Sequence, residues 1–211
     1  MKYTHIVFDI DGTLLDNENA VLSSLQDVLR KVLAKEFLKD ELRFVIGITS
    51  EIALAQLGIE DLEHAKQLWL DYYPNYADSI FVYNGIADCL KLLHEQGYVL
   101  GILTSKTALE YQKEFAPLGL SQYFDVVVCA DDTIEHKPNP GPMLEFLKQA
   151  KAEANSTLYI GDTVHDMHCA QEAGADFVLA LWGCKSPELV STSRRLSSPA
   201  ELNVLLSEAT D

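Results

Sequence analysis

An apolar run that ends in two aspartates near the N-terminus constrains the fold of this chain more than any other feature. Residues 6–13 read Ile-Val-Phe-Asp-Ile-Asp-Gly-Thr. A short apolar run of this kind predicts a buried strand, and such strands are typical of parallel sheets covered by helices on both faces. Asp9 and Asp11 would then lie at the carboxyl end of the strand, where open α/β sheets bind ligands.

The spacing of Asp9 and Asp11 suggests a cation site. In an extended segment two residues with this spacing point to the same side. Two ionised carboxylates that lie together repel each other, so the pair implies a bound cation, and a site with only oxygen ligands suits Mg²⁺. The alternative interpretation is a turn or helix cap before Gly12, because Asp-Gly is a common turn signal.

The composition excludes several classes of protein. The chain has 211 residues, of which 48% are hydrophobic, so it can bury a substantial core. Its net charge of −16 argues against nonspecific binding to nucleic acid or to an anionic membrane. A local cation could still attract an anionic substrate. The four cysteines form no C-x-x-C pair, and we see no secretion signal or membrane-spanning run, so we expect a cytoplasmic protein with reduced thiols.

Helical and strand patterns divide the chain into two kinds of region. Residues 3–8 predict a strand, and no strand pattern follows before residue 76. That interval has helical spacing at residues 16–37, 40–46, 50–57 and 61–76. From residue 84, predicted strands at 98–103, 125–129, 157–160 and 177–181 alternate with predicted helices at 87–96, 108–115, 142–151, 166–173 and 199–206. Such alternation indicates a parallel sheet.

The first strand must rejoin this sheet, so the helical block is an insertion. We therefore expect an α/β fold with a Rossmann-like parallel sheet and helices on both faces, plus an inserted helical-bundle cap domain. The predicted catalytic core comprises residues 1–14 and 83–211, and the predicted cap comprises residues 15–82.

Polar residues recur where the predicted strands end. Thr104 and Ser105 follow the strand at 98–103, Lys137 lies in a Pro-rich loop after the next strand, and Asp162 and Asp166 follow the strand at 157–160. Parallel strands would bring these groups to one edge of the sheet, beside the first aspartate pair. A set of carboxylates, hydroxyls and one ammonium suits metal-assisted phosphoryl transfer.

Four short segments resemble, in order, the motifs of the haloacid dehalogenase superfamily. They are Asp9-Ile10-Asp11-Gly12-Thr13, Leu103-Thr104-Ser105, Lys137-Pro138-Asn139-Pro140 and Gly161-Asp162-Thr163-Val164-His165-Asp166. The insertion resembles the C1-type cap of the phosphoglycolate phosphatase and β-phosphoglucomutase group, on the sequence Phe-Val-Ile-Gly-Ile-Thr at residues 44–49.

The resemblance implies a role for each acidic residue. Asp9 would be the nucleophile that forms an aspartyl-phosphate, and Asp11 would protonate the leaving oxygen and later accept a proton from water. The Asp9 side chain, the backbone carbonyl of Asp11 and Asp162 would bind Mg²⁺, with Asp166 supporting the metal directly or through water. The groups implied to bind the phosphate are Thr104, the backbone of Ser105, and Lys137. Those implied to approach the substrate from the cap are Gly47, Ile48 and Thr49.

Asp11 favours phosphate esters, because haloacid dehalogenases lack a second aspartate here. We expect a Mg²⁺-dependent phosphatase acting on a small phosphorylated metabolite, such as phosphoglycolate or a sugar phosphate, as a monomer or homodimer. A phosphomutase of the β-phosphoglucomutase type would need a basic cluster in the cap, where Arg43 is the nearest cation to the cap motif. A pyrophosphatase and a non-catalytic interaction protein are the remaining alternatives.

Several other polar residues are expected to have ordinary structural roles. Lys106 would begin a helix and point outward, and His136 would be an exposed loop histidine. His165 and His168 flank Asp166, but no third soft ligand completes a zinc site. Tyr73 would belong to the cap core or its rim.

Overall fold

A six-stranded parallel sheet forms the centre of the computed structural model, which describes residues 2–208. Residue 1 and residues 209–211 of the predicted core segments lie outside this range. The strand order is β5-β4-β1-β6-β7-β8, and each adjacent pair is parallel. The strands are β1 (His5–Phe8), β4 (Val99–Leu103), β5 (Val126–Val128), β6 (Thr157–Gly161), β7 (Asp176–Ala180) and β8 (Arg195–Leu196). The predicted α/β fold with a parallel sheet is confirmed.

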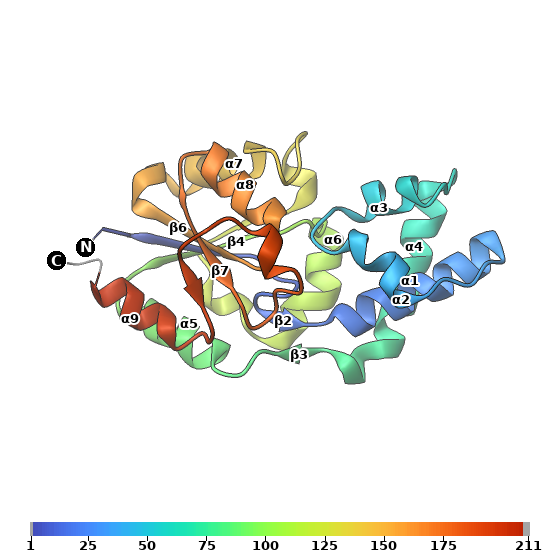
Figure 1. Cartoon of the computed structure of the whole chain (residues 1–211), viewed down its shortest axis with the longest axis horizontal. Helices are drawn as coiled ribbons and strands as arrows, with labels where there is room; N and C mark the ends of the chain where they lie inside the picture. Colours follow the sequence, from blue (N-terminus) through green and yellow to red (C-terminus); the bar gives the residue numbers. More distant parts are fainter. Residues whose placement is uncertain (1, 209–211) are drawn as a thin grey trace.

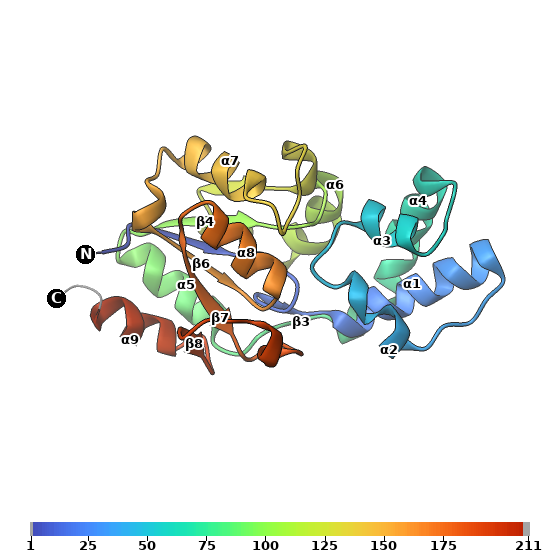
Figure 2. The ribbon, with the colours of Figure 1, turned by 45° about the horizontal axis from the view of Figure 1, so that its top comes forward.

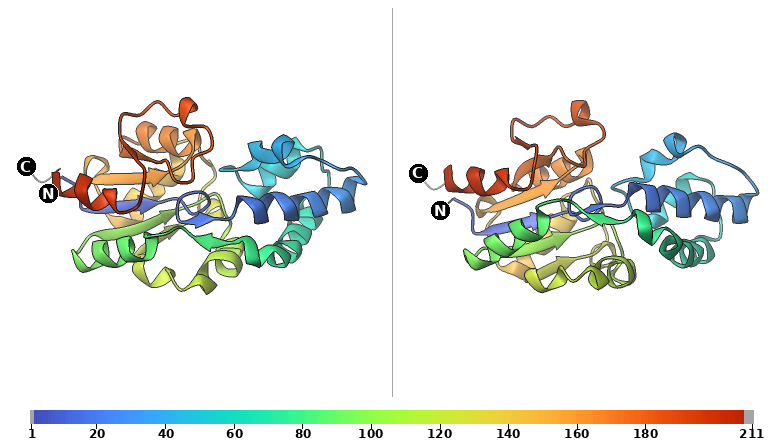
Figure 3. Two further views of the ribbon diagram at one scale, coloured as in Figure 1. Left: turned by 60° about the horizontal axis from the view of Figure 1, so that its bottom comes forward. Right: turned by 90° about the horizontal axis from the view of Figure 1, so that it is seen from below.

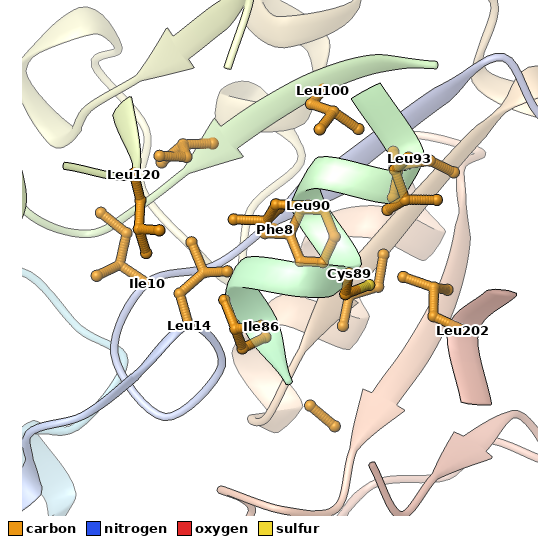
Figure 4. Packing of buried hydrophobic residues seen from close by; sticks show 14 of the residues in the cluster. Phe8, Ile10, Leu14, Ile86, Cys89, Leu90, Leu93, Leu100, Leu120 and Leu202 are labelled. Carbon is orange, nitrogen blue, oxygen red and sulfur yellow. The ribbon is translucent and has the colours of Figure 1, made fainter. Parts of the chain in front are cut away.

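Helices cover both faces of this sheet (Figures 1 and 2). Helices α5 (Ile86–Glu95) and α9 (Glu201–Glu208) lie on one face, and α7 (Gly141–Ala150) and α8 (Val164–Glu172) lie on the other. Ile6 and Phe8 pack toward α5, as Figure 4 shows for Phe8 and Leu90, while Val7 packs toward the α7 and α8 side. Both faces of β1 are therefore buried, which explains its unbroken apolar sequence.

One close contact fixes how α7 sits on the sheet. A Cβ atom on Gly101 in β4 would lie 2.1 Å from the Phe146 ring of α7. Phe146 is completely buried. The absence of a side chain at position 101 thus lets a large aromatic residue pack directly against the strand backbone.

The helical insertion lies beyond the carboxyl ends of the strands, at the opposite end of the molecule from the two termini (Figure 3). It has its own apolar cluster, which includes Leu25, Leu29 and Leu54. Its elements are α1 (Glu18–Leu33), α2 (Lys39–Leu42), η1 (Arg43–Val45), α3 (Ser50–Gln56), α4 (Leu62–Tyr72) and η2 (Tyr73–Ser79). The predicted insertion is present, and its limits as a domain at residues 15–82 stay a prediction.

The structure adds features that the sequence pattern missed. A two-stranded antiparallel ladder of β2 (Leu15–Asp16) and β3 (Phe81–Val82) joins the two connections to the insertion. These strands and β8 are two residues long, too short to show a period. The helix predicted at 108–115 is divided into α6 (Ala108–Glu110) and a π-helical turn, η3 (Tyr111–Phe115). Within residues 2–208, no helix combines the length and the apolar character needed to cross a membrane.

We expect Gly101→Ala to lower the free energy of unfolding by about 1–3 kcal/mol, because the added methyl group overpacks the contact with Phe146. Denaturant unfolding measures this change. In a Phe146→Leu background the cost of Gly101→Ala should be smaller, because the two sites are coupled. An equal cost in both backgrounds would contradict this account.

Candidate active site

The polar side chains that follow the strands lie together at the carboxyl edge of the sheet. Asp9 follows β1, Thr104 follows β4, Lys137 lies in the loop after β5, and Asp162 follows β6. Carboxylate oxygens of Asp9, Asp162 and Asp166 lie within 4.8 Å of one another, and all three residues are buried. We call these three residues the aspartate cluster.

Gly12 lets the aspartate cluster form against the end of β1. Its backbone φ is +80°, a conformation that other residues rarely adopt. A Cβ atom here would lie 2.2 Å from Oδ2 of Asp162. Glycine therefore serves two purposes: it turns the chain after Asp11, and it leaves room for the carboxylate of Asp162, which follows β6.

Lys137 neutralises part of the cluster charge. Its Nζ donates to Oδ1 of Asp9 at 2.9 Å and to Oδ1 of Asp166 at 2.7 Å, and all three side chains are buried. Burial lowers the pKa of Lys137, but the two carboxylates outweigh it and hold the pKa above its ordinary value. The lysine is therefore a fixed positive charge beside Asp9.

Asp166 is occupied by protein donors on both carboxylate oxygens. Oδ1 also accepts from the Tyr159 hydroxyl at 2.9 Å, and Oδ2 accepts from the backbone N and Oγ1 of Thr163 at 3.0 and 2.6 Å. Burial raises the Asp166 pKa, but Lys137 and these hydrogen bonds outweigh it, so the pKa lies below its ordinary value. Asp166 thus suits a supporting role that orients Lys137 better than direct metal ligation.

Asp9 and Asp162 have the properties of cation ligands. Burial, together with repulsion from neighbouring carboxylates, raises the pKa of Asp9 to about 7 and raises that of Asp162 well above its ordinary value. Asp162 accepts one hydrogen bond, from Oγ1 of Thr13 at 3.2 Å. A divalent cation would stabilise both ionised carboxylates, and the oxygen-only donor set fits Mg²⁺.

The Asp11 side chain lies apart from the aspartate cluster. Its Oδ1 accepts a hydrogen bond from Nδ2 of Asn17 and lies 3.1 Å from Nζ of Lys106. The Asn17 amide also donates to the Tyr73 hydroxyl at 3.0 Å, and Tyr73 belongs to the helical insertion. Asp11 is therefore directed toward the insertion. Asp9 and Asp11 thus have different partners, and the expectation that the pair holds one cation stays a prediction.

The expected outward position of Lys106 is also wrong. The residue is 8% exposed, and its Nζ donates to Oε2 of Glu114 at 2.6 Å. The helix begins only at Ala108, after the capping residue Thr107, so Lys106 lies in the preceding loop and turns inward. Glu114, eight positions after Lys106, is the partner that the sequence offered. Residues on a helix pair at a spacing of three or four, so the sequence provides no reason to connect these two. His136 is half-buried, contrary to the expected exposure.

A cavity of about 60 Å³ lies between the sheet edge and the insertion. Asp9, Asp11 and Ser105 line it from the core, and Gly47 and Ile48 line it from the insertion. Oγ of Ser105 donates to the Gly47 carbonyl at 2.9 Å, which joins the two sides. This volume holds only a few water molecules. It therefore suits a small substrate.

Two residues expected to contact substrate have other partners. Thr49 is buried and caps α3, where its hydroxyl accepts from the Ile52 backbone N at 3.3 Å. Thr104 is also buried, and its Oγ1 accepts from the Lys106 backbone N at 3.2 Å. Neither residue is among those that line the cavity.

Comparison with known proteins identifies the family. Residues 6–180 match the family model for haloacid dehalogenase-like hydrolases, and the chain belongs to this family. Its fold and insertion are those of the members with a C1-type cap. Among residues 2–208, the aspartate cluster combines two of the four motifs: Asp9 comes from the first motif, and Asp162 and Asp166 come from the fourth.

Three relatives illustrate the similarity. The chain is 27% identical over 186 residues to the pyrophosphatase PpaX of Bacillus mycoides, covering 88% of this chain and 86% of that one. It is 31% identical over 187 residues to IndB of Dickeya dadantii, provisionally named a phosphatase, covering 84% and 81%. A provisionally assigned phosphoglycolate phosphatase from Lactobacillus plantarum superimposes with a TM-score of 0.87 at 30% identity, covering 97% and 100%.

We expect Mg²⁺ to raise the thermal unfolding midpoint of the wild type but not of Asp162→Asn, because ligands that bind only the folded state stabilise it.

The apparent affinity for Mg²⁺ should increase with pH. Below the Asp9 pKa of about 7, Mg²⁺ must displace a proton from this carboxyl group. The dissociation constant of Mg²⁺ should therefore fall by up to about tenfold for each unit that the pH rises. Calorimetric titration at about pH 6 and about pH 8 measures this; tighter binding at the lower pH would contradict it.

Proposed function

We propose that this protein is a Mg²⁺-dependent phosphatase that hydrolyses a small phosphomonoester, such as phosphoglycolate or a sugar phosphate, through an aspartyl-phosphate. One observation carries the proposal. Asp9 and Asp11 line the same cavity but have different partners: Asp9 contacts Lys137 within the aspartate cluster, and Asp11 is directed toward the insertion. Two carboxylates in distinct surroundings can perform different tasks.

In the first step, an Asp9 carboxylate oxygen forms a bond to phosphorus on the side opposite the leaving oxygen. The bond from phosphorus to the leaving oxygen breaks, and that oxygen keeps the electron pair and takes a proton from Asp11. In the second step, water attacks phosphorus and gives a proton to Asp11. The bond to Asp9 breaks, its electrons return to the carboxylate, and phosphate leaves.

The surrounding residues support these steps. Lys137 offsets the negative charge on Asp9 and on the phosphoryl oxygens that approach it. A Mg²⁺ ion held by Asp9, Asp162 and the Asp11 backbone carbonyl would further neutralise the phosphoryl group. The Ser105 backbone and Thr104 are proposed to orient that group, and the insertion is proposed to shield the reacting atoms from bulk water.

Pyrophosphate is a second candidate substrate. Relatives of this chain from Bacillus mycoides and other bacteria are named pyrophosphatases. The same two-step chemistry would apply, with phosphate as the leaving group.

The phosphomutase alternative has weaker support, because Arg43 does not face the cavity beside Asp9. Its guanidinium is half exposed and pairs with Glu18 at 2.9 Å and with Asp40 at 2.9 Å. It borders a separate cavity of about 200 Å³ beside Asp162. A second phosphate therefore lacks a basic cluster among the described residues of the first cavity, where Lys106 is already paired with two carboxylates.

We expect release of phosphate from a panel of phosphoglycolate, sugar phosphates and pyrophosphate, dependent on Mg²⁺. Asp9→Asn should lower the rate by about 10³-fold or more, because the amide is not an adequate nucleophile. Equal, negligible rates for the wild type and for Asp9→Asn across the panel would favour the non-catalytic interaction protein instead.

Asp11→Asn should reduce kcat for an alkyl phosphate by about 10²–10⁴-fold, because the leaving oxygen is no longer protonated. Stabilisation by Mg²⁺ should remain, since only the backbone carbonyl of this residue is proposed to contact the metal. Loss of Mg²⁺ stabilisation in a folded Asp11→Asn protein would refute this division of roles between Asp9 and Asp11.

A further inference from the structure

The structure contains a second buried lysine beside the cavity, to which the mechanism above assigns no task. We propose that Lys106, anchored by Glu114, is a positioning residue that holds the Asp11 carboxylate where it can deliver its proton. This inference rests on the proposed phosphatase function and assigns part of its rate to a residue outside the aspartate cluster.

The contacts of Lys106 are arranged around one ammonium group. Nζ lies 2.6 Å from Oε2 of Glu114 and 3.1 Å from Oδ1 of Asp11. The Tyr73 ring covers it, with 5.4 Å between Nζ and the ring centroid. The side chains of Lys106 and Glu114 are each 9% exposed, whereas that of Asp11 is 20% exposed. The anchor is thus more deeply buried than the carboxylate it holds.

Glu114 has no place in the aspartate cluster, yet it is nearly buried and borders the cavity. It lies in the π-helical turn η3, a geometry that often occurs at functional sites and that re-aims side chains relative to a regular helix. A buried carboxylate is costly unless it is paired. The Glu114–Lys106 pair therefore fixes the position of the ammonium beside Asp11.

Asp11 is held from two directions by this arrangement. Asn17, at the start of the insertion, donates to the same carboxylate oxygen that Lys106 contacts from the core. Asn17 and Tyr73 are also hydrogen bonded to each other at 3.0 Å. The carboxylate therefore has few alternative rotamers while the insertion is in contact with the core.

The two buried lysines divide the site between them. Lys137 contacts Asp9 and Asp166, and Lys106 contacts Asp11 and Glu114. Each ammonium thus pairs one of the two reacting carboxylates with one supporting carboxylate. This division makes a specific prediction, because only the two proton transfers of Asp11 should depend on Lys106, and only the first of them depends on the leaving group.

The dependence on the leaving group tests this assignment. An alkyl alcohol must receive the Asp11 proton as its bond to phosphorus breaks, whereas 2,4-dinitrophenolate can depart as an anion and needs no proton. We expect Lys106→Met to lower kcat/KM for an alkyl phosphate about 10²-fold and for 2,4-dinitrophenyl phosphate less than about threefold. This ratio covers the steps up to the aspartyl-phosphate and omits its hydrolysis, in which Asp11 also accepts a proton. KM for the alkyl phosphate should change by less than about threefold, because Lys106 holds Asp11 and not the substrate.

Two further variants complete the experiment. Glu114→Gln keeps the shape of the anchor without its charge, and it should give the same selective loss at about 5- to 10-fold. Lys113→Met removes an exposed lysine from the same π-helical turn and should leave both rates unchanged. Stabilisation by Mg²⁺ in each variant shows that the aspartate cluster is intact.

The outcomes separate the inference from the proposed function. An equal loss of kcat/KM for both esters, or a loss for the alkyl phosphate that lies in KM alone, would overturn the role of Lys106 while leaving the phosphatase assignment in place. If Lys106→Met does not fold, Glu114→Gln decides, and a folded Glu114→Gln protein with no selectivity overturns the inference. A wild type that hydrolyses neither ester would refute the proposed function itself.

Discussion

Repulsion among buried carboxylates is the constraint on which the rest of this structure depends. Asp9, Asp162 and Asp166 lie within 4.8 Å of one another at the carboxyl edge of the sheet. One buried ammonium, from Lys137, bridges two of them. Burial, together with the remaining negative charge, keeps the pKa of Asp9 and of Asp162 above their ordinary values. The folded chain thus holds negative charge that is only partly compensated, and a bound divalent cation would neutralise it.

The sheet and the insertion line the site from opposite sides. The parallel strands end at one edge and fix the carboxylates on rigid elements, where small errors of position are least tolerated. The insertion lies across that edge and closes a cavity of about 60 Å³ through contacts such as that between Ser105 and Gly47. Asp11 lies at the boundary, with partners from both parts.

The sequence was informative where residues act through local pattern. An unbroken apolar run identified β1, and polar residues after the strands identified Asp9, Lys137 and Asp162, because parallel topology brings strand ends together. It failed for Lys106, whose environment depends on a π-helical turn and on Glu114. That environment has no periodic signature. Thr49 caps a helix, and its expected contact with substrate stays a prediction, because capping and substrate contact use the same residue types.

By itself, the sequence determined the α/β class, the helical insertion and the set of residues at the sheet edge, since hydrophobic period and motif order are properties of the chain alone. Only the tertiary structure decided how the charges are paired. It directed Asp11 away from the aspartate cluster, occupied both oxygens of Asp166 and turned Lys106 inward. The physical reason is that the pairing of buried charges depends on distances of a few ångströms between distant segments, and no local pattern encodes them.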